Sequence, residues 1–208
     1  MGGRDERRPP AGRRLFVAVE VPPVVHDAVD EALEPWRGTP GARWVPRERR
    51  HVTVRFLGKV APDAVDGVAR AVGACAAATA PVDTRLTGLG AFPSPRRARV
   101  LWAGVDDGAG RLAGLGLTLD GALAAGIRPE MPEMRPEMRP EIRTEARAFR
   151  PHLTVARCDR PARLPDEYAA TLLGPVGFRV ASLVLFESVP GGRGPRRYEA
   201  VERAGFAG

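Results

Sequence analysis

Apolar and polar residues alternate in several runs of the chain, which predicts strands that are buried on one face. The predicted strands cover residues 15–21, 82–89, 100–105, 178–187 and 198–203, and two more begin at His51 and His152. Apolar residues at helical spacing instead predict helices over residues 24–34, 62–79, 112–126 and 164–173. Because strands and helices are mixed and several connections are short, the pattern predicts an α+β fold.

Two of the predicted strands open with the same pattern of four residues. His51-Val52-Thr53-Val54 and His152-Leu153-Thr154-Val155 both read His-apolar-Thr-apolar. Alternation places the His and Thr of each copy on one face of its strand. The opposite, buried face should receive Val52, Val54, Phe56, Leu153 and Val155. Two such strands lying together would surround one small site with two imidazoles and two hydroxyls, a set that suits an anion such as phosphate.

The length of 208 residues fits one domain with a sizeable core. No run of about 18 apolar residues is present, and the N-terminal segment lacks the apolar stretch of a secretory signal. We therefore expect a cytoplasmic protein that does not enter a membrane. Cys75 and Cys158 lack the spacing of a zinc ribbon or a disulfide framework, and Cys75 lies in an alanine-rich helical stretch as a small core residue.

The formal net charge of +7 favours a polyanionic partner such as a nucleic acid. Arginine supplies almost all of the positive charge, since Lys59 is the only lysine among 32 basic residues. A general enrichment of the chain in Arg, Ala and Gly is an alternative explanation. The charge balance is therefore compatible with RNA binding but does not define it.

Two segments are too polar to join a core. Residues 1–13 are charged and rich in Gly and Pro, which predicts a disordered tail. Residues 128–147 repeat a short unit of Arg, Pro, Glu and Met, and proline at this density blocks regular helix and strand. We expect an exposed loop there, within a single domain over residues 14–206. Two interpretations of this loop are kept: it acts as a lid or RNA contact, or it is a neutral expansion of a surface loop.

The sequence around the two tetrapeptides, HVTVRFLG and PHLTVAR, resembles that of the two-histidine (2H) phosphoesterase superfamily. Within it, the chain is most similar to the RNA 2′,3′-cyclic phosphodiesterases, also called 2′-5′ RNA ligases. The opening RLFVAVEVP, the lead-in WVPRERRHVTVRFLG and the closing strand pair follow in the family's order, over roughly residues 13–204. The resemblance implies a bilobal fold in which two pseudo-symmetric, mostly antiparallel sheets flank a central cleft and the helices lie outside.

The resemblance also implies a reaction, the hydrolysis of 2′,3′-cyclic phosphate ends of RNA to 2′-phosphates. Such a reaction needs a base for water and an acid for the departing ribose oxygen, and histidine suits both roles. By similarity to the family, His51 is the proton donor and His152 the proton acceptor. The two local patterns are alike and do not distinguish these roles. Thr53 and Thr154 can donate hydrogen bonds to the phosphate, and no metal or cofactor is implied.

Of three further residues considered for a substrate contact, only Arg157 is included in the site. Arg157 matches an arginine that follows the second motif in the family, where it contacts substrate. Strict alternation sets it on the face opposite His152, so it requires a strand end or a β-bulge. Arg55 falls on the His51 face by alternation, but a rim charge explains it and we do not include it in the site. Phe16 could stack on a base, although a core role is expected for it.

The arginines that precede His51 allow two interpretations: an RNA-facing rim formed by Arg47, Arg49 and Arg50, or a solvated run of charge. Other functions are also conceivable on the same fold. One is an RNA-binding module without turnover, and another is the reverse reaction, which joins RNA ends through a 2′-5′ linkage. A zinc site built from the histidines and Cys158 lacks ligand spacing. We expect a monomer whose partners are RNA or nucleotides with 2′,3′-cyclic phosphate ends.

Overall fold

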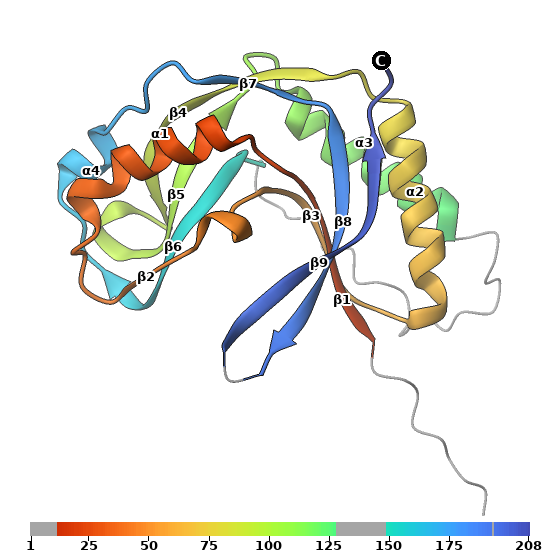
Figure 1. Cartoon of the computed structure of the whole chain (residues 1–208), viewed down its shortest axis with the longest axis horizontal. Coiled ribbons are helices and arrows are strands. Elements are labelled where there is room, and N and C mark those ends of the chain that lie inside the picture. Colours follow the sequence, from red (N-terminus) through yellow and green to blue (C-terminus); the bar gives the residue numbers. More distant parts are fainter. Residues whose placement is uncertain (1–11, 128–148, 193) are drawn as a thin grey trace, which may run out of the picture.

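A computed structural model describes residues 12–127, 149–192 and 194–208. The strands within these residues are β1 (Arg13–Val19), β2 (Ala42–Trp44), β3 (Val52–Val60), β4 (Val82–Phe92), β5 (Ala98–Asp106), β6 (His152–Ala162), β7 (Gly177–Val180), β8 (Ser182–Gly191) and β9 (Gly194–Gly205). The α-helices are α1 (Pro23–Leu33), α2 (Val65–Ala77), α3 (Arg111–Ile127) and α4 (Asp166–Ala170). Short 3₁₀ helices lie at Glu34–Trp36, Arg47–Arg49, Pro62–Ala64 and Pro95–Arg97. Figure 1 shows their arrangement.

The described strands form one hydrogen-bonded sheet in the order β7-β4-β5-β6-β3-β1-β8-β9, with β2 added beside β6. All of these strand pairs are antiparallel. The centre of this sheet is its weakest junction, because β3 and β6 share the single ladder pair Val52 and Leu153. The sheet therefore consists of two halves, each with one motif strand at its inner edge. The predicted α+β fold with two related halves is confirmed.

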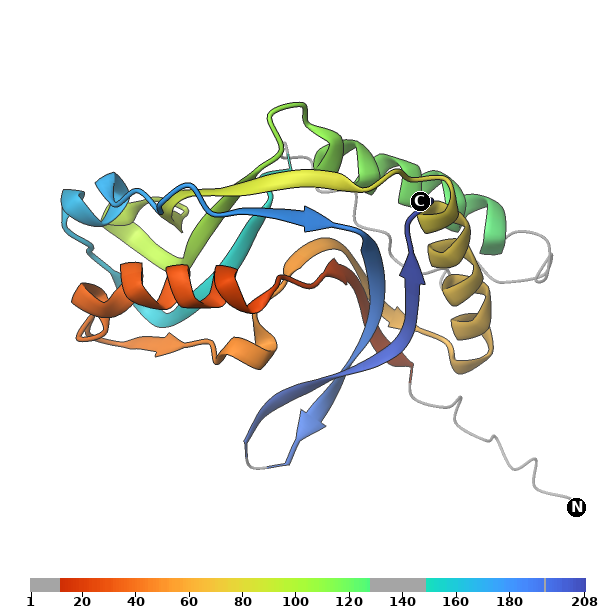
Figure 2. The same cartoon turned by 45° about the horizontal axis from the view of Figure 1, so that its top comes forward.

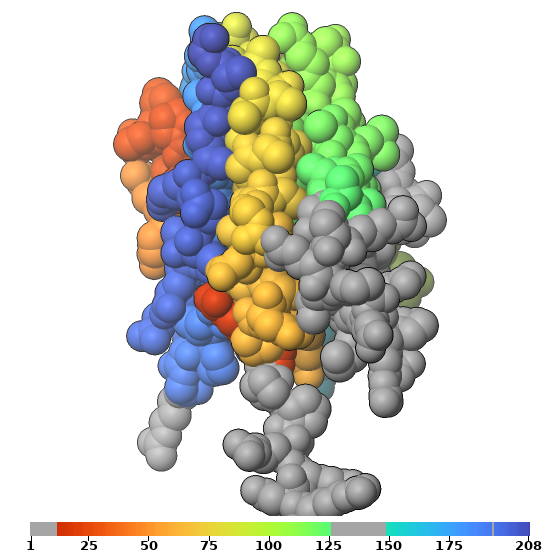
Figure 3. Space-filling view, turned by 90° about the vertical axis from the view of Figure 1, so that its right-hand side faces the viewer, coloured from red at the N-terminus to blue at the C-terminus, as the bar shows by residue number. Residues whose placement is uncertain are grey.

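The helices cover the outside of the two halves (Figure 1). α1 and α4 lie on the half formed by β4, β5 and β6, where Trp36 packs edge-on against Tyr168 at a ring distance of 5.3 Å. α2 and α3 lie on the other half, and Figure 3 shows them side by side, with β9 running along α2. In α3, four leucines at helical spacing are all buried: Leu112, Leu115, Leu119 and Leu123.

The central strand β1 is buried on both faces. Leu15, Val17 and Val19 join the main core that the helices cover, together with the core residue Cys75. Phe16 and Ala18 point to the other side of the sheet, where they form a second apolar cluster with neighbours on β8. Burial on both faces explains why this strand reads as a nearly continuous apolar run.

The structure corrects one predicted strand. Residues 178–187 form parts of two strands, β7 and β8, which are separated at Ala181. β7 pairs with β4 at one edge of the sheet, whereas β8 pairs with β1 in the other half. Apolar residues recur on both sides of the break, at Phe178 and Val180 in β7 and from Leu183 in β8, so the change of half leaves no mark in the pattern. Figures 1 and 2 show the long β8–β9 hairpin projecting from the second half.

Several other boundaries differ from the predicted ones. β2 was not predicted because three residues are too few for a visible alternation. The helix predicted over residues 164–173 contains only the five-residue α4. β1 begins at Arg13, the last residue assigned to the tail. The rest of that predicted tail, apart from Gly12, and the repeat loop at 128–147 lie outside the described residues. Within the described part of the chain, no helix is long and apolar enough to cross a membrane.

Candidate functional site

The two tetrapeptides meet where the two halves of the sheet join. Val52 pairs with Leu153 in antiparallel register. Continuing this register by one residue in each direction sets His51 opposite Thr154 and Thr53 opposite His152. The structure thus brings the four predicted site residues together in a crosswise arrangement, in which the histidine of each motif lies opposite the threonine of the other in register.

A β-bulge interrupts each motif strand at the same point. In β3, Thr53 pairs with Ala18 but the next pair is Arg55 with Val17, so Val54 is an extra residue. In β6, Thr154 pairs with Trp102 and Ala156 pairs with Leu101, so Val155 is the extra residue. Each bulge lies three residues after the motif histidine, and it reverses the alternation of faces beyond it.

The second bulge gives Arg157 the orientation that its predicted role requires. Arg157 pairs with Val100, which lies on the same face of β5 as Trp102, the partner of Thr154. Arg157 is therefore on the His152 and Thr154 face, and its side chain is exposed. Its positive charge is also close enough to lower the pKa of His51.

The first bulge turns Arg55 away from the site. The prediction by alternation, which placed Arg55 on the His51 face, is therefore wrong. Arg55 points to the helix-covered face, where it forms an ion pair with Asp120 of α3 at 2.6 Å and donates to the carbonyl of Gly116 at 3.2 Å. Its side chain is only 12% exposed, so it is not a rim charge. Arg55 is a structural residue that ties β3 to α3.

Phe56 is also placed differently from its prediction. The bulge turns it out of the core to the site face, where it pairs with Phe16 and is 53% exposed. Phe56 follows His51 by five residues, as Arg157 follows His152. The two halves therefore present an aromatic ring and a guanidinium at equivalent places. Val52, Val54, Leu153 and Val155 are buried as predicted.

Both imidazoles are held by the backbone two residues earlier. Nδ1 of His152 lies 2.6 Å from the carbonyl oxygen of Arg150. A carbonyl only accepts, so this nitrogen carries the proton and Nε2 is left as the proton-transfer atom. His51 makes the corresponding hydrogen bond with the backbone of Arg49. The shared contact orients both rings in the same way relative to their strands.

The surroundings of the two imidazoles differ. His51 stacks on Phe16 at a ring distance of 4.9 Å and meets the edge of Tyr198 at 5.3 Å. Burial among these rings lowers the pKa of His51 to about 4. The hydrogen bond to Arg49 and the charge of Glu20 oppose this effect, whereas the charges of Arg157 and Arg49 add to it.

His152 has two aromatic rings beside it. The ring of Phe92 meets it edge-on at 5.1 Å, and that of Trp102 lies at 6.3 Å. Trp102 lies across Gly90 of β4, where a Cβ would overlap the indole ring. The glycine therefore allows Trp102 to lie flat against the sheet near the second motif.

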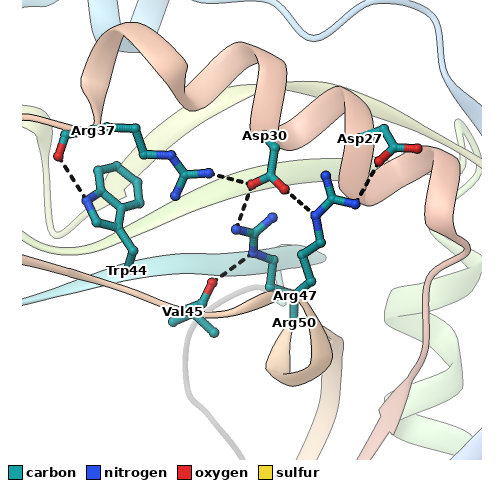
Figure 4. A network of polar contacts seen from close by, with 7 residues as sticks. All are labelled: Asp27, Asp30, Arg37, Trp44, Val45, Arg47 and Arg50. Carbon is teal, nitrogen blue, oxygen red and sulfur yellow. Dashed lines mark hydrogen bonds and ion pairs between the residues drawn. The ribbon is translucent and has the colours of Figure 1, made fainter.

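An ionic network fixes the segment that leads into the first motif (Figure 4). Asp30 of α1 accepts from Arg37 at 2.6 Å, from Arg50 at 2.8 Å and also from Arg47. Burial raises the pKa of Asp30, but the hydrogen bonds from Arg50 and Arg47 outweigh it and hold the pKa below its usual value. Arg47 and Arg50 are thus structural, which contradicts the RNA-facing rim for these two residues.

The same network reaches the second motif. Nε of Arg50 donates to the carbonyl of Val45 at 2.9 Å. The amide of Val45 donates to the carbonyl of Val155, the bulge residue, at 2.8 Å. α1, the first motif and the second motif are therefore connected by an unbroken set of hydrogen bonds. Arg49 differs from its neighbours because its guanidinium lies over the ring of Tyr198 at 5.2 Å.

Sequence reasoning did not find Tyr198 and Phe186, which complete the aromatic surroundings of His51. Both come from the closing hairpin, and only the long-range pairing of β1 with β8 and of β8 with β9 brings them to the site. Cys158 is buried on the core side of β6. Among the described residues, no three His, Cys, Asp or Glu side chains group as a metal site would require.

The fold and the paired motifs together define a 2H phosphoesterase. Within that class, the chain belongs to the 2'-5' RNA ligase superfamily, whose family model matches residues 25–192. An RNA 2',3'-cyclic phosphodiesterase of Thermus thermophilus is 33% identical over 153 residues, which cover 73% of this chain and 72% of the relative. The resemblance inferred from the motifs is confirmed.

Other relatives with the same description match a shorter part. The Archaeoglobus fulgidus protein is 33% identical over 94 residues, and the Aeropyrum pernix protein is 32% identical over 122 residues. These matches cover 45% and 58% of this chain, and 52% and 60% of the two relatives.

Solved structures match nearly the whole chain. The protein TT0787 of Thermus thermophilus has a TM-score of 0.74 and 29% identity, with 94% of this chain and 98% of that chain covered. Escherichia coli LigT, in a complex with 3'-AMP, has a TM-score of 0.72 and 20% identity, with 95% and 99% covered. The LigT likeness shows the fold alone.

Proposed function

We propose that the chain hydrolyses 2′,3′-cyclic phosphate ends of RNA to 2′-phosphomonoesters. The observation that carries this proposal is the crosswise meeting of the two His-x-Thr-x tetrapeptides at the Val52 and Leu153 pair. Two imidazoles and two hydroxyls then converge on one small volume, with an exposed guanidinium on the same face. The name RNA 2',3'-cyclic phosphodiesterase, borne by several relatives, supports the same reaction.

In the proposed reaction, His152 takes a proton from water while the water oxygen bonds to phosphorus. The bond from phosphorus to the ribose 3′ oxygen breaks, and His51 gives that oxygen a proton. The 2′ ester remains, so the product is a 2′-phosphate. Thr53 and Thr154 donate hydrogen bonds to the phosphoryl oxygens, and Arg157 compensates their charge in the transition state.

The pKa of His51 bears on its role as the acid. A pKa of about 4 leaves the imidazole neutral at pH 7. A bound phosphate places negative charge near the ring, which favours the imidazolium. The proposed acid therefore acquires its proton on substrate binding, and the stacked rings around it exclude water from the charge that forms. The opposite assignment, with His51 as base, would use the neutral imidazole that this lowered pKa favours.

The reaction is tested with a short RNA that ends in a 2′,3′-cyclic phosphate, incubated in excess EDTA, with the 2′- and 3′-phosphate products separated by chromatography. The proposal predicts turnover and a 2′-phosphate. A 3′-phosphate would contradict the direction of ring opening, and loss of turnover that added metal restores would contradict the metal-free chemistry. Binding without turnover would favour an RNA-binding module, and joining of added 5′-hydroxyl RNA would favour the reverse reaction.

The roles of acid and base can be distinguished with a substrate whose leaving group departs without being protonated. With a nucleoside phosphodiester that releases p-nitrophenolate, the variant lacking the acid retains its activity, whereas the variant lacking the base does not. We expect His51→Ala to retain most activity on this substrate and His152→Ala to lose it. The reverse pattern would exchange the roles.

We also propose that a monomer is active, since both motifs come from the same chain. Specific activity should then be independent of protein concentration across the range in which any dimer dissociates. A fall in specific activity on dilution would contradict this.

A further inference from the structure

The second half of the sheet presents three rows of side chains on the site face. Thr53 pairs with Ala18 in the row nearest to the second motif. The next row consists of Phe56, Phe16 and Phe186, which pair in register across β3, β1 and β8. Beyond it, Lys59 pairs with Arg14. We call these two residues the outer basic pair.

The bulges of β3 produce this order. Thr53, Phe56 and Lys59 follow one another at intervals of three residues, which in a regular strand would set neighbours on opposite faces. The bulge at Val54 and a second irregularity at Leu57 keep all three on the same face. On the regular strand β1, Ala18, Phe16 and Arg14 share that face by simple alternation. Hydroxyl, aromatic and basic groups therefore follow one another outward from the proposed phosphate site.

The outer basic pair carries its charge at the exposed surface. Arg14 and Lys59 are both exposed, and within the described residues neither has an acidic partner. Other arginines of this half behave differently: Arg13 pairs with Glu187 at 2.6 Å, and Arg203 pairs with Glu20. Two cations side by side repel each other, and an anion between them would relieve this repulsion.

Resting on the proposed function, we propose that the outer basic pair binds the first internucleotide phosphate of the RNA, the one that links the terminal nucleoside to its predecessor. The aromatic row, with Phe56 53% exposed, supports the terminal nucleoside between the two phosphates. Along β1, Arg14 lies four residues from Ala18, a distance of roughly 13 Å at the rise of a strand. The long side chains of Arg14 and Lys59 cover part of this distance, and one nucleotide spans the rest.

The proposal makes the outer basic pair a determinant of substrate length. A mononucleoside 2′,3′-cyclic phosphate lacks the internucleotide phosphate, whereas a dinucleotide with the same cyclic end contains it. The ratio of kcat/KM for the dinucleotide to that for the mononucleoside should fall roughly threefold to tenfold in Arg14→Gln/Lys59→Gln. Arg111→Gln/Arg179→Gln, which removes the same charge from α3 and from the far edge of the sheet, should leave the ratio as it is.

Binding provides a second readout that does not depend on turnover. Fluorescence anisotropy with a single-stranded RNA ending in a 2′-phosphate should show weaker binding by Arg14→Gln/Lys59→Gln. The slope of log affinity against log salt should also become shallower by about one. An unchanged substrate ratio, an unchanged salt slope or equal changes in the control variant would overturn the proposal. Absence of hydrolysis by the wild type would instead refute the proposed reaction, and the binding measurement would still decide on the outer basic pair.

Discussion

The two halves of the site share their local construction and differ in what surrounds it. Each contributes a His-x-Thr-x tetrapeptide, a bulge at the fourth residue and a hydrogen bond between the histidine and the backbone two residues earlier. His51, however, is enclosed by Phe16, Phe186 and Tyr198. His152 has Phe92 and Trp102 beside it.

The difference extends to the fifth residue after each histidine. That place holds Phe56 in the first half and Arg157 in the second, and the bulges turn both toward the site. A symmetric frame therefore carries an asymmetric surface, with the aromatic groups concentrated near His51. The comparison suggests that the frame positions the phosphate, whereas the asymmetry separates the roles of the two imidazoles and orients the nucleoside.

The largest effect should come from removing either imidazole. His51→Ala and His152→Ala should each lower kcat on a cyclic-phosphate RNA by about a thousandfold, because each removes one proton-transfer step. His26→Ala is the matched control, as the chain has three histidines and this one lies in α1. Steady-state kinetics checks the prediction, and near-normal kcat in both motif variants would refute the paired mechanism.

The hydroxyls should matter less, and about equally in the two halves. Thr53→Val and Thr154→Val keep the shape of the side chain but remove a donor to the phosphate, so kcat should fall by about a hundredfold in each. Thr118→Val, on an exposed part of α3, serves as the control. A large effect in only one motif variant would show that the phosphate does not lie between the two strands.

The two arginines should separate binding from stability. Arg157→Gln should lower kcat/KM roughly tenfold and leave the free energy of unfolding almost unchanged, because its side chain is exposed. Arg55→Gln should retain the kinetics but lose about 2 kcal/mol of unfolding free energy, since it leaves Asp120 without its partner. Steady-state kinetics and urea unfolding of both variants check that one loses activity and the other loses stability. The reverse pattern would mean that the bulges are absent in solution.

An effect of about the same size as the loss in Arg55→Gln is expected in the pH dependence of stability. The pKa of His51 is about 4 in the folded chain and near 6.5 when unfolded, so the unfolded chain binds more protons between these values. The folded state should therefore be most stable above about pH 6.5 and lose roughly 2 kcal/mol by pH 5 through this residue.

Urea unfolding of the wild type and of His51→Gln at pH 7.5 and pH 5 isolates this contribution. Burial also lowers the pKa of His26, so part of the pH dependence should remain in the variant. Identical pH dependence in both proteins would contradict the enclosed environment of His51.

Local pattern was enough to predict the fold class, most elements and the four motif residues. Strict alternation failed at Arg55 and Phe56 because one extra residue in a strand changes the parity of every later side chain. The sequence showed that Arg157 needs a β-bulge or a strand end to reach the site face, but it did not show where such a bulge lies. The split between β7 and β8, and the approach of Tyr198 to His51, depend on pairings between distant strands. No local signal encodes such pairings.

The central claim is that one phosphate lies between the two motifs, and histidine NMR tests it directly. Three histidines give few signals, which His26→Ala, His51→Ala and His152→Ala assign. On titration with a nucleoside 2′-phosphate, the account predicts that His51 and His152 shift together with one dissociation constant. In the complex, the pKa of His51 should also rise above its value of about 4. A shift of only one of these two histidines, or an unchanged pKa of His51 in the saturated complex, would contradict the account.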